Sequence, residues 1–284
     1  MENINLESAK QISKSSKSSF YYAFNLLPVE QRDAMNTVYA FCRRTDDIVD
    51  EDFEDNNVKY ENLRKWRNEL ERGLRGQSEY SLLNKLSIII RKFNIPLEPF
   101  FELIKGMEMD LQNNRYQNME ELLTYCYRVA STVGLMCIEI FGYKNKSARN
   151  YAINLGLAMQ LTNILRDVKK DAEKGRIYLP QSDLNKFNYS ENDLFNNIYN
   201  NEFIALMQHE GSLAKKYFKD ADEALNFEDK PSMFAARAMQ HIYFKLLKRL
   251  EEKKFDIYSD DINVTKFEKA SIAVGVWAKY SLVY

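Results

Sequence analysis

Residues 151–180 read YAINLGLAMQLTNILRDVKKDAEKGRIYLP, and no other segment of the sequence is as informative about structure. Between Tyr151 and Val168, apolar residues occupy nearly the whole circumference of an expected helix, which is typical of a helix buried inside a protein. One row at helical spacing is nevertheless polar, and it carries Gln160, Asn163, Asp167 and Asp171. Buried acidic groups are costly unless they are paired, hydrogen-bonded or bound to a metal. The row therefore predicts a partner, and a divalent cation is the obvious candidate.

A second acidic cluster lies upstream, in the segment TDDIVDED at residues 45–52. Asp46 and Asp50 are four residues apart, so their carboxylates would lie about 6 Å apart along a helix axis. One interpretation is an ordinary solvated face, opposite an apolar face that includes Phe41 and Ile48. The other is a second ligand row, and the presence of the Asn163 row favours it.

Two oxygen-rich rows on two helices are expected to face each other across a cavity. Oxygen ligands without a nearby histidine or cysteine favour Mg²⁺, which keeps several waters and is often completed by substrate phosphates. The expected metal ligands are Asp46, Asp50, Asn163, Asp167 and Asp171. Arginines adjoin both rows, and they suit bidentate contact with phosphate oxygens: Arg43, Arg166 and Arg176. Acid, metal and arginine together predict a site that holds a diphosphate.

In four blocks the sequence resembles the squalene/phytoene synthase family. These are SFYYAF at 19–24, DDIVD at 46–50, YCYRVASTVG at 125–134, and NILRD at 163–167 with Asp171 and GRIYLP at 175–180. A lone DDxxD motif is weak evidence, whereas four blocks in the same order and spacing are strong evidence. The resemblance extends over roughly residues 10–255.

The resemblance implies a fold and a reaction. The expected fold is all-α, a single class I isoprenoid synthase-like helical bundle around a central cavity, spanning residues 1–284. The expected reaction joins two prenyl diphosphates head to head through a cyclopropylcarbinyl diphosphate, with release of diphosphate and with two or three Mg²⁺ ions.

As the substrate we expect farnesyl diphosphate, which would give a C30 product. The alternative is phytoene synthesis from two geranylgeranyl diphosphates, and a more distant one is another class I terpenoid synthase. The use of NADPH stays open.

Further site residues follow from the resemblance, each with a plainer alternative. Ser18 and Ser19 are expected to face phosphate, although the surrounding KSSKSS segment also fits a flexible linker. Five aromatic residues are expected to line a dry cavity and to stabilise cationic carbon, although at least two should be ordinary core: Phe20, Tyr22, Phe24, Tyr39 and Tyr127.

The remaining site residues are expected on the cavity wall. Ala130 and Gly134 would make this wall thin enough for a prenyl chain, and the alternative for Gly134 is close helix packing. Tyr243 would approach the cavity or pack in the core. A basic residue for phosphate has no clear counterpart in the tail, where Lys266 and Lys269 are the nearest candidates.

The composition agrees with a helical enzyme. Only 9 Gly and 5 Pro occur in 284 residues, the hydrophobic content is 45%, and a net charge of −1 gives no nucleic-acid footprint. The three cysteines lack CxxC spacing, so we expect reduced core residues in a cytoplasmic protein. No signal peptide or transmembrane segment is expected, but peripheral membrane contact for release of a greasy product stays open.

Periodicity predicts the positions of the helices. A first helix is expected from near Leu6, and 183–200 is expected to form a short helix and loops. The longer helices are expected at 30–50, 59–75, 81–93, 99–113, 119–141, 202–225 and 232–254.

Overall fold

The computed structural model describes residues 23–50 and 55–282, and these residues form helices and loops without a strand. The α-helices are α3 (Val29–Asp50), α4 (Asn56–Gly73), α5 (Ser81–Lys92), α6 (Glu98–Gln112), α7 (Met119–Cys126), α8 (Thr132–Phe141), α9 (Ala148–Glu173), α10 (Gln181–Lys186), α11 (Glu191–Phe195), α12 (Asn201–Ala224), α13 (Phe234–Glu252) and α14 (Lys266–Leu282). Two shorter turns are the π-helix η1 (Tyr127–Ser131) and the 3₁₀-helix η2 (Phe227–Asp229). The all-α prediction is therefore confirmed.

Most expected helices are found within a few residues of their predicted ends. Local sequence sets several of these ends, because a side-chain oxygen accepts from an otherwise unpaired backbone N–H at the helix start. Asp55 begins α4 in this way, Asn118 begins α7 and Asn200 begins α12. The 183–200 region contains two short helices, α10 and α11. The helix expected from near Leu6 lies outside the described residues.

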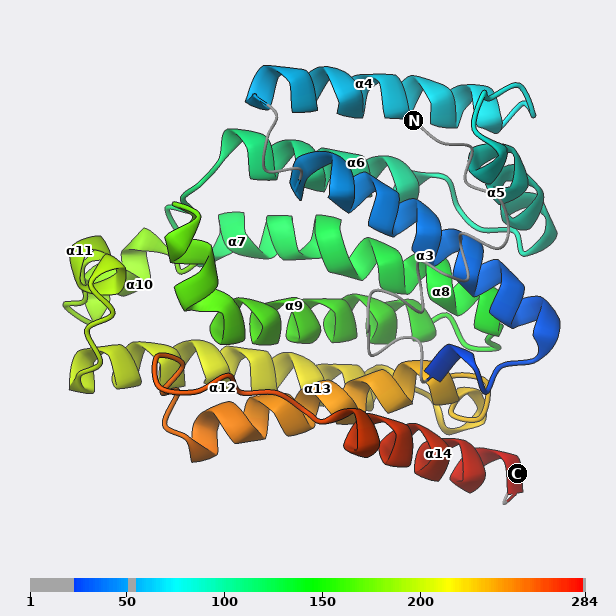
Figure 1. Ribbon diagram of the computed structural model, residues 1–284. Helices are drawn as coiled ribbons and strands as arrows, with labels where there is room; N and C mark the ends of the chain where they lie inside the picture. The colour runs from blue at the N-terminus through cyan, green and yellow to red at the C-terminus, as the bar shows by residue number, and fades with distance from the viewer. Residues whose placement is uncertain (1–22, 51–54, 283–284) are drawn as a thin grey trace.

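The long helices lie side by side around α9 (Figure 1). α9 packs against α8, η1, α12 and α13, while α3 packs against α4, α5, α6 and α8. α14 covers α13 on the side away from α3 (Figure 1). This arrangement surrounds α9 with protein, which explains the apolar circumference in its sequence.

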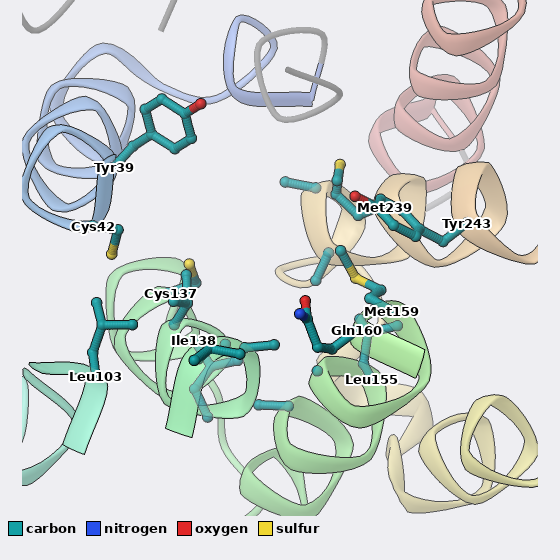
Figure 2. Close-up of a pocket in the computed structure, with 18 of the residues that line it drawn as sticks. Tyr39, Cys42, Leu103, Cys137, Ile138, Leu155, Met159, Gln160, Met239 and Tyr243 are labelled. Atoms are coloured by element: carbon teal, nitrogen blue, oxygen red, sulfur yellow. The ribbon is translucent and has the colours of Figure 1, made fainter. Parts of the chain in front are cut away.

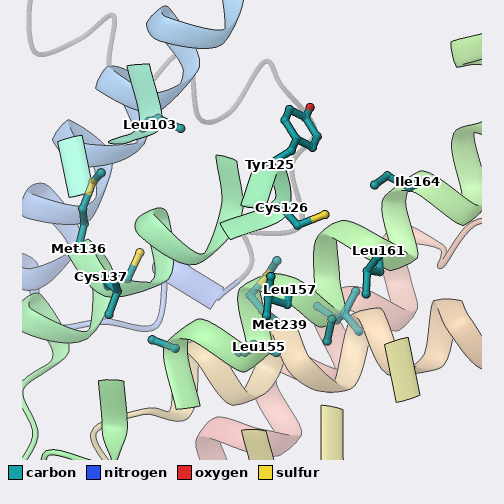
Figure 3. Close-up of a cluster of buried hydrophobic side chains, with 14 of the residues drawn as sticks. Leu103, Tyr125, Cys126, Met136, Cys137, Leu155, Leu157, Leu161, Ile164 and Met239 are labelled. Carbon is teal, nitrogen blue, oxygen red and sulfur yellow. The ribbon is translucent and has the colours of Figure 1, made fainter. Parts of the chain in front are cut away.

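The core confirms that interpretation of α9. Leu155, Leu157, Leu161 and Ile164 are all buried, and Figure 3 shows them in the same apolar cluster as Met239 of α13. Burying one such side chain stabilises the fold by about 1.5–3 kcal/mol relative to leaving it exposed. The three cysteines are unpaired, with Cys126 and Cys137 buried and Cys42 half-buried. In the part of the chain that the structure describes, no helix has both the length and the apolarity needed to cross a membrane.

Two glycines let the α8 side of the core approach α9 closely. A Cβ on Gly156 would lie 2.5 Å from Cα of Ser131, and one on Gly134 would lie 2.9 Å from the carbonyl oxygen of Ala152. Ser131 Oγ also donates to the carbonyl of Ile153 at 2.8 Å. Close packing therefore accounts for both glycines, and both also line the central cavity.

One segment differs from its prediction. Residues 119–141 run as α7, η1 and α8 rather than as one regular helix. In η1 the N–H of Thr132 donates to the carbonyl of Tyr127, five residues earlier. A π-helix turn holds an extra residue, so it rotates the faces before it relative to the faces after it.

Candidate active site

A central cavity of about 280 Å³ lies between α3, α6, η1–α8, α9 and α13. Figure 2 shows side chains from these helices converging on it, among them Tyr39, Leu155 and Met239. Most of the lining is apolar, and the polar lining side chains include Arg43, Asp46, Gln160 and Asn163. The cavity therefore joins a hydrocarbon-like interior to a charged end.

Nine residues predicted for the site line this cavity. They are Phe24, Tyr39, Arg43, Asp46, Ala130, Gly134, Gln160, Asn163 and Tyr243. Phe24 and Tyr39 pack edge to face, with ring centroids 6.5 Å apart. Ser18, Ser19, Phe20 and Tyr22 lie outside the described residues. The structure thus brings residues from both acidic rows to one cavity, and their chemical roles stay predictions.

The first row contributes a half-buried acid–base cluster from α3. Arg43 Nη1 lies 2.9 Å from Asp46 Oδ2, and Arg43 Nη2 lies 2.6 Å from Asp47 Oδ1. Burial and the nearby charge of Asp50, opposed by Arg43, together raise the pKa of Asp46 to about 7. A bound cation would favour the ionised form of such a carboxyl group.

Asn163 supplies an uncommitted oxygen to the cavity. Its Oδ1 is buried without a hydrogen-bond partner, while its Nδ2 donates to Gln160 Oε1 at 3.4 Å. Tyr243 lines the same cavity as Asn163, and burial is the main reason that the Tyr243 pKa is raised. A buried amide oxygen without a partner is unfavourable unless a ligand uses it.

The second row continues away from the cavity along α9. Asp167 is ion-paired with the neighbouring Arg166. Burial and the charge of Asp167, opposed by Arg176, together raise the pKa of Asp171 to about 7. Arg176 Nη1 also lies 3.7 Å from Asp50 Oδ1, so one side chain joins the end of the second row to the first.

The donors fit a magnesium ion that retains water and substrate oxygens. Within residues 23–50 and 55–282, no three histidine, cysteine or carboxylate side chains are gathered closely enough to hold a metal alone. All the candidate donors are oxygens, and Mg²⁺ commonly takes only one or two carboxylates together with substrate phosphates. The unpartnered oxygen of Asn163 is a further donor of this type.

A third acid, not anticipated from the sequence, lies between the two rows. Asp110 of α6 accepts from Tyr178 OH at 2.8 Å and from Tyr125 OH at 3.0 Å. Burial raises its pKa to about 6, opposed by the Tyr178 hydrogen bond and by the charge of Arg176. In the sequence Asp110 is one of several charged residues of the helix expected at 99–113, which also holds Glu102, Lys105 and Glu108, so nothing there set it apart.

Tyr127, expected on the cavity wall, is not among the residues that line the cavity, and its role in the reaction stays a prediction. Burial and the nearby charge of Glu98, at the start of α6, raise the pKa of the Tyr127 hydroxyl. Seven residues make about two turns of a regular helix, so Tyr127 and Gly134 were expected to share a face. The π-helix breaks this relation, and Tyr125 points toward the acidic rows instead.

Of the two candidate lysines in the tail, Lys269 is the one near the site. It is half-buried on α14, and its pKa is lowered by burial and by the charge of Arg166. Lys266 is exposed. Two cationic groups this close to each other would be stabilised by an anionic ligand.

Comparisons with known proteins identify the family of this chain. The family model described as squalene/phytoene synthase matches residues 13–268. The chain is 35% identical over 275 residues to 15-cis-phytoene synthase from Synechococcus elongatus, covering 93% of this chain and 89% of that protein. It is 34% identical over 276 residues to phytoene synthase from Arthrospira platensis, with the same coverages of 93% and 89%.

Solved structures agree as well. A dehydrosqualene synthase crystal structure superimposes with a TM-score of 0.85 at 28% identity, covering 98% of this chain and 97% of that one. A squalene synthase from Alicyclobacillus acidocaldarius gives 0.79 at 25% identity, covering 88% and 94%. The chain belongs to the squalene/phytoene synthase family. It is a prenyltransferase of isoprenoid biosynthesis, and its family condenses prenyl diphosphates head to head with the help of a divalent metal.

Proposed function

We propose that this enzyme condenses two geranylgeranyl diphosphates into phytoene. The observation that carries the proposal is the 35% identity with 15-cis-phytoene synthase from Synechococcus elongatus over 93% of the chain. These relatives favour the geranylgeranyl alternative over the farnesyl diphosphate that we expected from the sequence.

The charged end of the cavity would hold the diphosphate. Magnesium ions would be held by Asp46, Asp50, Asn163, Asp167 and Asp171, and when bound they neutralise charge that develops on the leaving group. Arg43 and Arg166 lie beside these donors, and Arg176 lies beside Asp50. Their guanidinium groups would contact phosphate oxygens and fix the orientation of the diphosphate.

The interior of the cavity would protect the allylic cation. Its wall is apolar along α8 and α9, which excludes the water that would otherwise capture the cation. Phe24, Tyr39 and Tyr243 contribute aromatic rings to this wall, and aromatic ring faces attract cationic carbon. The second prenyl chain would lie against the same wall, so that its double bond attacks the cation.

A second candidate substrate is farnesyl diphosphate. The specific observation in its favour is the TM-score of 0.85 with a dehydrosqualene synthase, over 98% of this chain. Both candidates use the same charged end, and they differ only in the length of the hydrocarbon chain that the cavity must hold.

One experiment separates the candidates. Purified protein would be incubated with Mg²⁺ and either geranylgeranyl or farnesyl diphosphate, with and without NADPH, and the extracted lipid identified by mass spectrometry. We expect phytoene from geranylgeranyl diphosphate. Conversion of farnesyl diphosphate alone would overturn the proposal.

The dependence on metal is tested separately. EDTA should stop the reaction and Mg²⁺ should restore it, and full activity in the chelator would contradict the metal sites.

Phytoene would leave into water only slowly, because it is almost entirely apolar. We therefore infer that the enzyme releases its product at a membrane surface. Phospholipid vesicles should raise the steady-state rate without changing the first turnover. An unchanged steady-state rate would contradict this step.

A further inference from the structure

Asp110 is held in a network that reaches both acidic rows. Its Oδ1 accepts from Tyr178 and its Oδ2 accepts from Tyr125, so one carboxylate orients two phenol groups. The two hydroxyl oxygens are also 3.4 Å apart. Tyr125 comes from α7 and Tyr178 from the loop after α9, so three separate segments meet at Asp110.

Aromatic stacking makes this network rigid. The rings of Tyr125 and Tyr178 stack with centroids 5.2 Å apart, and Tyr116 stacks on Tyr178 at 5.8 Å. The loop is also tied to the segment before α7, because Ile177 N donates to the carbonyl of Asn114 at 3.0 Å. The position of Tyr178 therefore fixes the loop that carries Arg176.

Arg176 lies close enough to Asp110 for their opposite charges to attract each other. Burial lowers the pKa of Arg176, but the surrounding Tyr178, Asp110 and Asp50 raise it by more. The guanidinium group is thus kept charged between a carboxylate on α6 and one at the end of α3. Arg176 N also donates to the carbonyl of Asp171 at 2.9 Å, so Arg176 contacts Asp171 of the second row and Asp50 of the first.

We propose that Asp110 is a positioning residue for the diphosphate end of the cavity. By accepting from Tyr125 and Tyr178 and attracting Arg176, it holds the Gly175–Pro180 loop against α3, so that both acidic rows keep the separation that a metal-bound diphosphate requires. The proposal rests on the proposed function for the identity of the ligand, but it does not depend on the length of the prenyl chain.

The direction of the change in diphosphate affinity distinguishes a positioning role of Asp110 from a direct effect of its charge. Removing a negative charge near a bound anion should by itself tighten binding of that anion, because one repulsion is lost. Loss of positioning should weaken it, and partners that orient metal-site groups typically contribute about 10–100-fold to affinity or activity. Weaker binding in an uncharged variant therefore reports lost geometry.

The test uses the full-length protein, inorganic diphosphate and calorimetry at saturating Mg²⁺. Asp110→Asn keeps the shape of the side chain, and we expect roughly tenfold weaker diphosphate binding. Binding of geranylgeraniol, which has no diphosphate, should not change. Asp229→Asn is the matched control, because Asp229 is buried and accepts from Lys144 N at 2.7 Å and Asn145 N at 3.1 Å, away from the cavity. It should lower the Tm without weakening diphosphate binding.

A second variant keeps the test decisive if Asp110→Asn does not fold. Tyr178→Phe removes one hydroxyl from the network and should also weaken diphosphate binding. Where both fold, the double variant should be no weaker than Asp110→Asn alone, because the two changes break the same interaction. Unchanged diphosphate affinity in the foldable variants, or additive losses, would overturn the proposal. A protein that binds diphosphate normally but makes no phytoene would contradict only the proposed function.

Discussion

Arg176 Nη1 lies 3.7 Å from Asp50 Oδ1, although the two residues belong to different acidic motifs. Both side chains are partly exposed, at 23% and 43%, and such ion pairs usually contribute only about 0–1 kcal/mol to stability. The importance of the Arg176–Asp50 ion pair is therefore its geometry and not its contribution to stability. The contact brings the end of α3 to the loop after α9, which is where a diphosphate must be held if both rows act on it.

The acidic rows are expected to be essential for turnover. Asp46→Ala or Asp167→Ala should lower kcat by at least roughly 100-fold, because each removes part of the electrostatic stabilisation of the leaving group. Helical content, measured by circular dichroism, should be unchanged. Glu61→Ala is a suitable control, since Glu61 is paired with Arg64 on the exposed face of α4. Near-normal product formation by either aspartate variant in saturating Mg²⁺ would refute the site.

The cavity wall at Ala130 should control chain length. Ala130→Phe would place a ring in the cavity and should reduce condensation of geranylgeranyl diphosphate by roughly tenfold or more, with a smaller effect on farnesyl diphosphate. Competition assays with both substrates would measure this ratio. Inhibition by inorganic diphosphate should stay the same. An equal loss for both substrates would mean that the ring disturbs the charged end instead.

The contact between α9 and η1 should tolerate no side chain at Gly156. Gly156→Ala would bring a Cβ to 2.5 Å from Cα and 2.6 Å from N of Ser131, and backbone atoms cannot move aside cheaply. We expect a loss of about 1–3 kcal/mol in the free energy of unfolding, measured with urea. Gly275→Ala on α14 is the matched control, since nothing lies within 4 Å of its Cβ position. That change should be neutral or should stabilise by about 0.5–1 kcal/mol.

Glu210 should make stability depend on pH. It is 2% exposed on α12, and burial and the neighbouring Asp183 raise its pKa from 4.5 to about 8. Because the folded state binds this proton more tightly than the unfolded state, Glu210 stabilises the fold below pH 4.5, and this contribution is lost as pH rises through about 8. The loss is on the order of a few kcal/mol, since one pKa unit corresponds to about 1.4 kcal/mol.

Thermal melts of Glu210→Gln test this expectation. The variant should match the parent protein near pH 5 and should be more stable than it at pH 9. Glu202→Gln changes an exposed acid on the same helix and should leave the Tm unchanged at both pH 5 and pH 9. Equal Tm differences at both pH values would show that Glu210 does not titrate in this range.

Much of the site was predictable because its signal is local. Asp46 and Asn163 stand in helical rows, and a period of 3.6 residues was enough to place each row on one face. That the two rows meet was inferred from their shared oxygen chemistry and from the resemblance, because sequence periodicity does not specify how helices pack. Asp110 was missed for that reason: its partners, Tyr125 and Tyr178, come from other segments.

Tyr127 shows a second reason why the sequence alone does not place every residue. Its assignment assumed a regular helix through residues 119–141, and nothing in the composition of YCYRVAS distinguishes a π-helix from an α-helix. Ser131, the last residue of this π-helix, packs closely against Gly156 of α9, which is a tertiary contact. Such a contact cannot be derived from one helix considered alone.

The π-helix also constrains how this active site can change. Its additional residue sets the phase between Tyr125, which points to the charged end, and Gly134, which faces the hydrocarbon end. Point substitutions alter either end without disturbing that phase, whereas deletion of a single residue from Tyr127–Ser131 would rotate one end relative to the other by about 100°. Substrate length and diphosphate chemistry are therefore free to diverge separately by substitution, while the length of this short segment is held fixed.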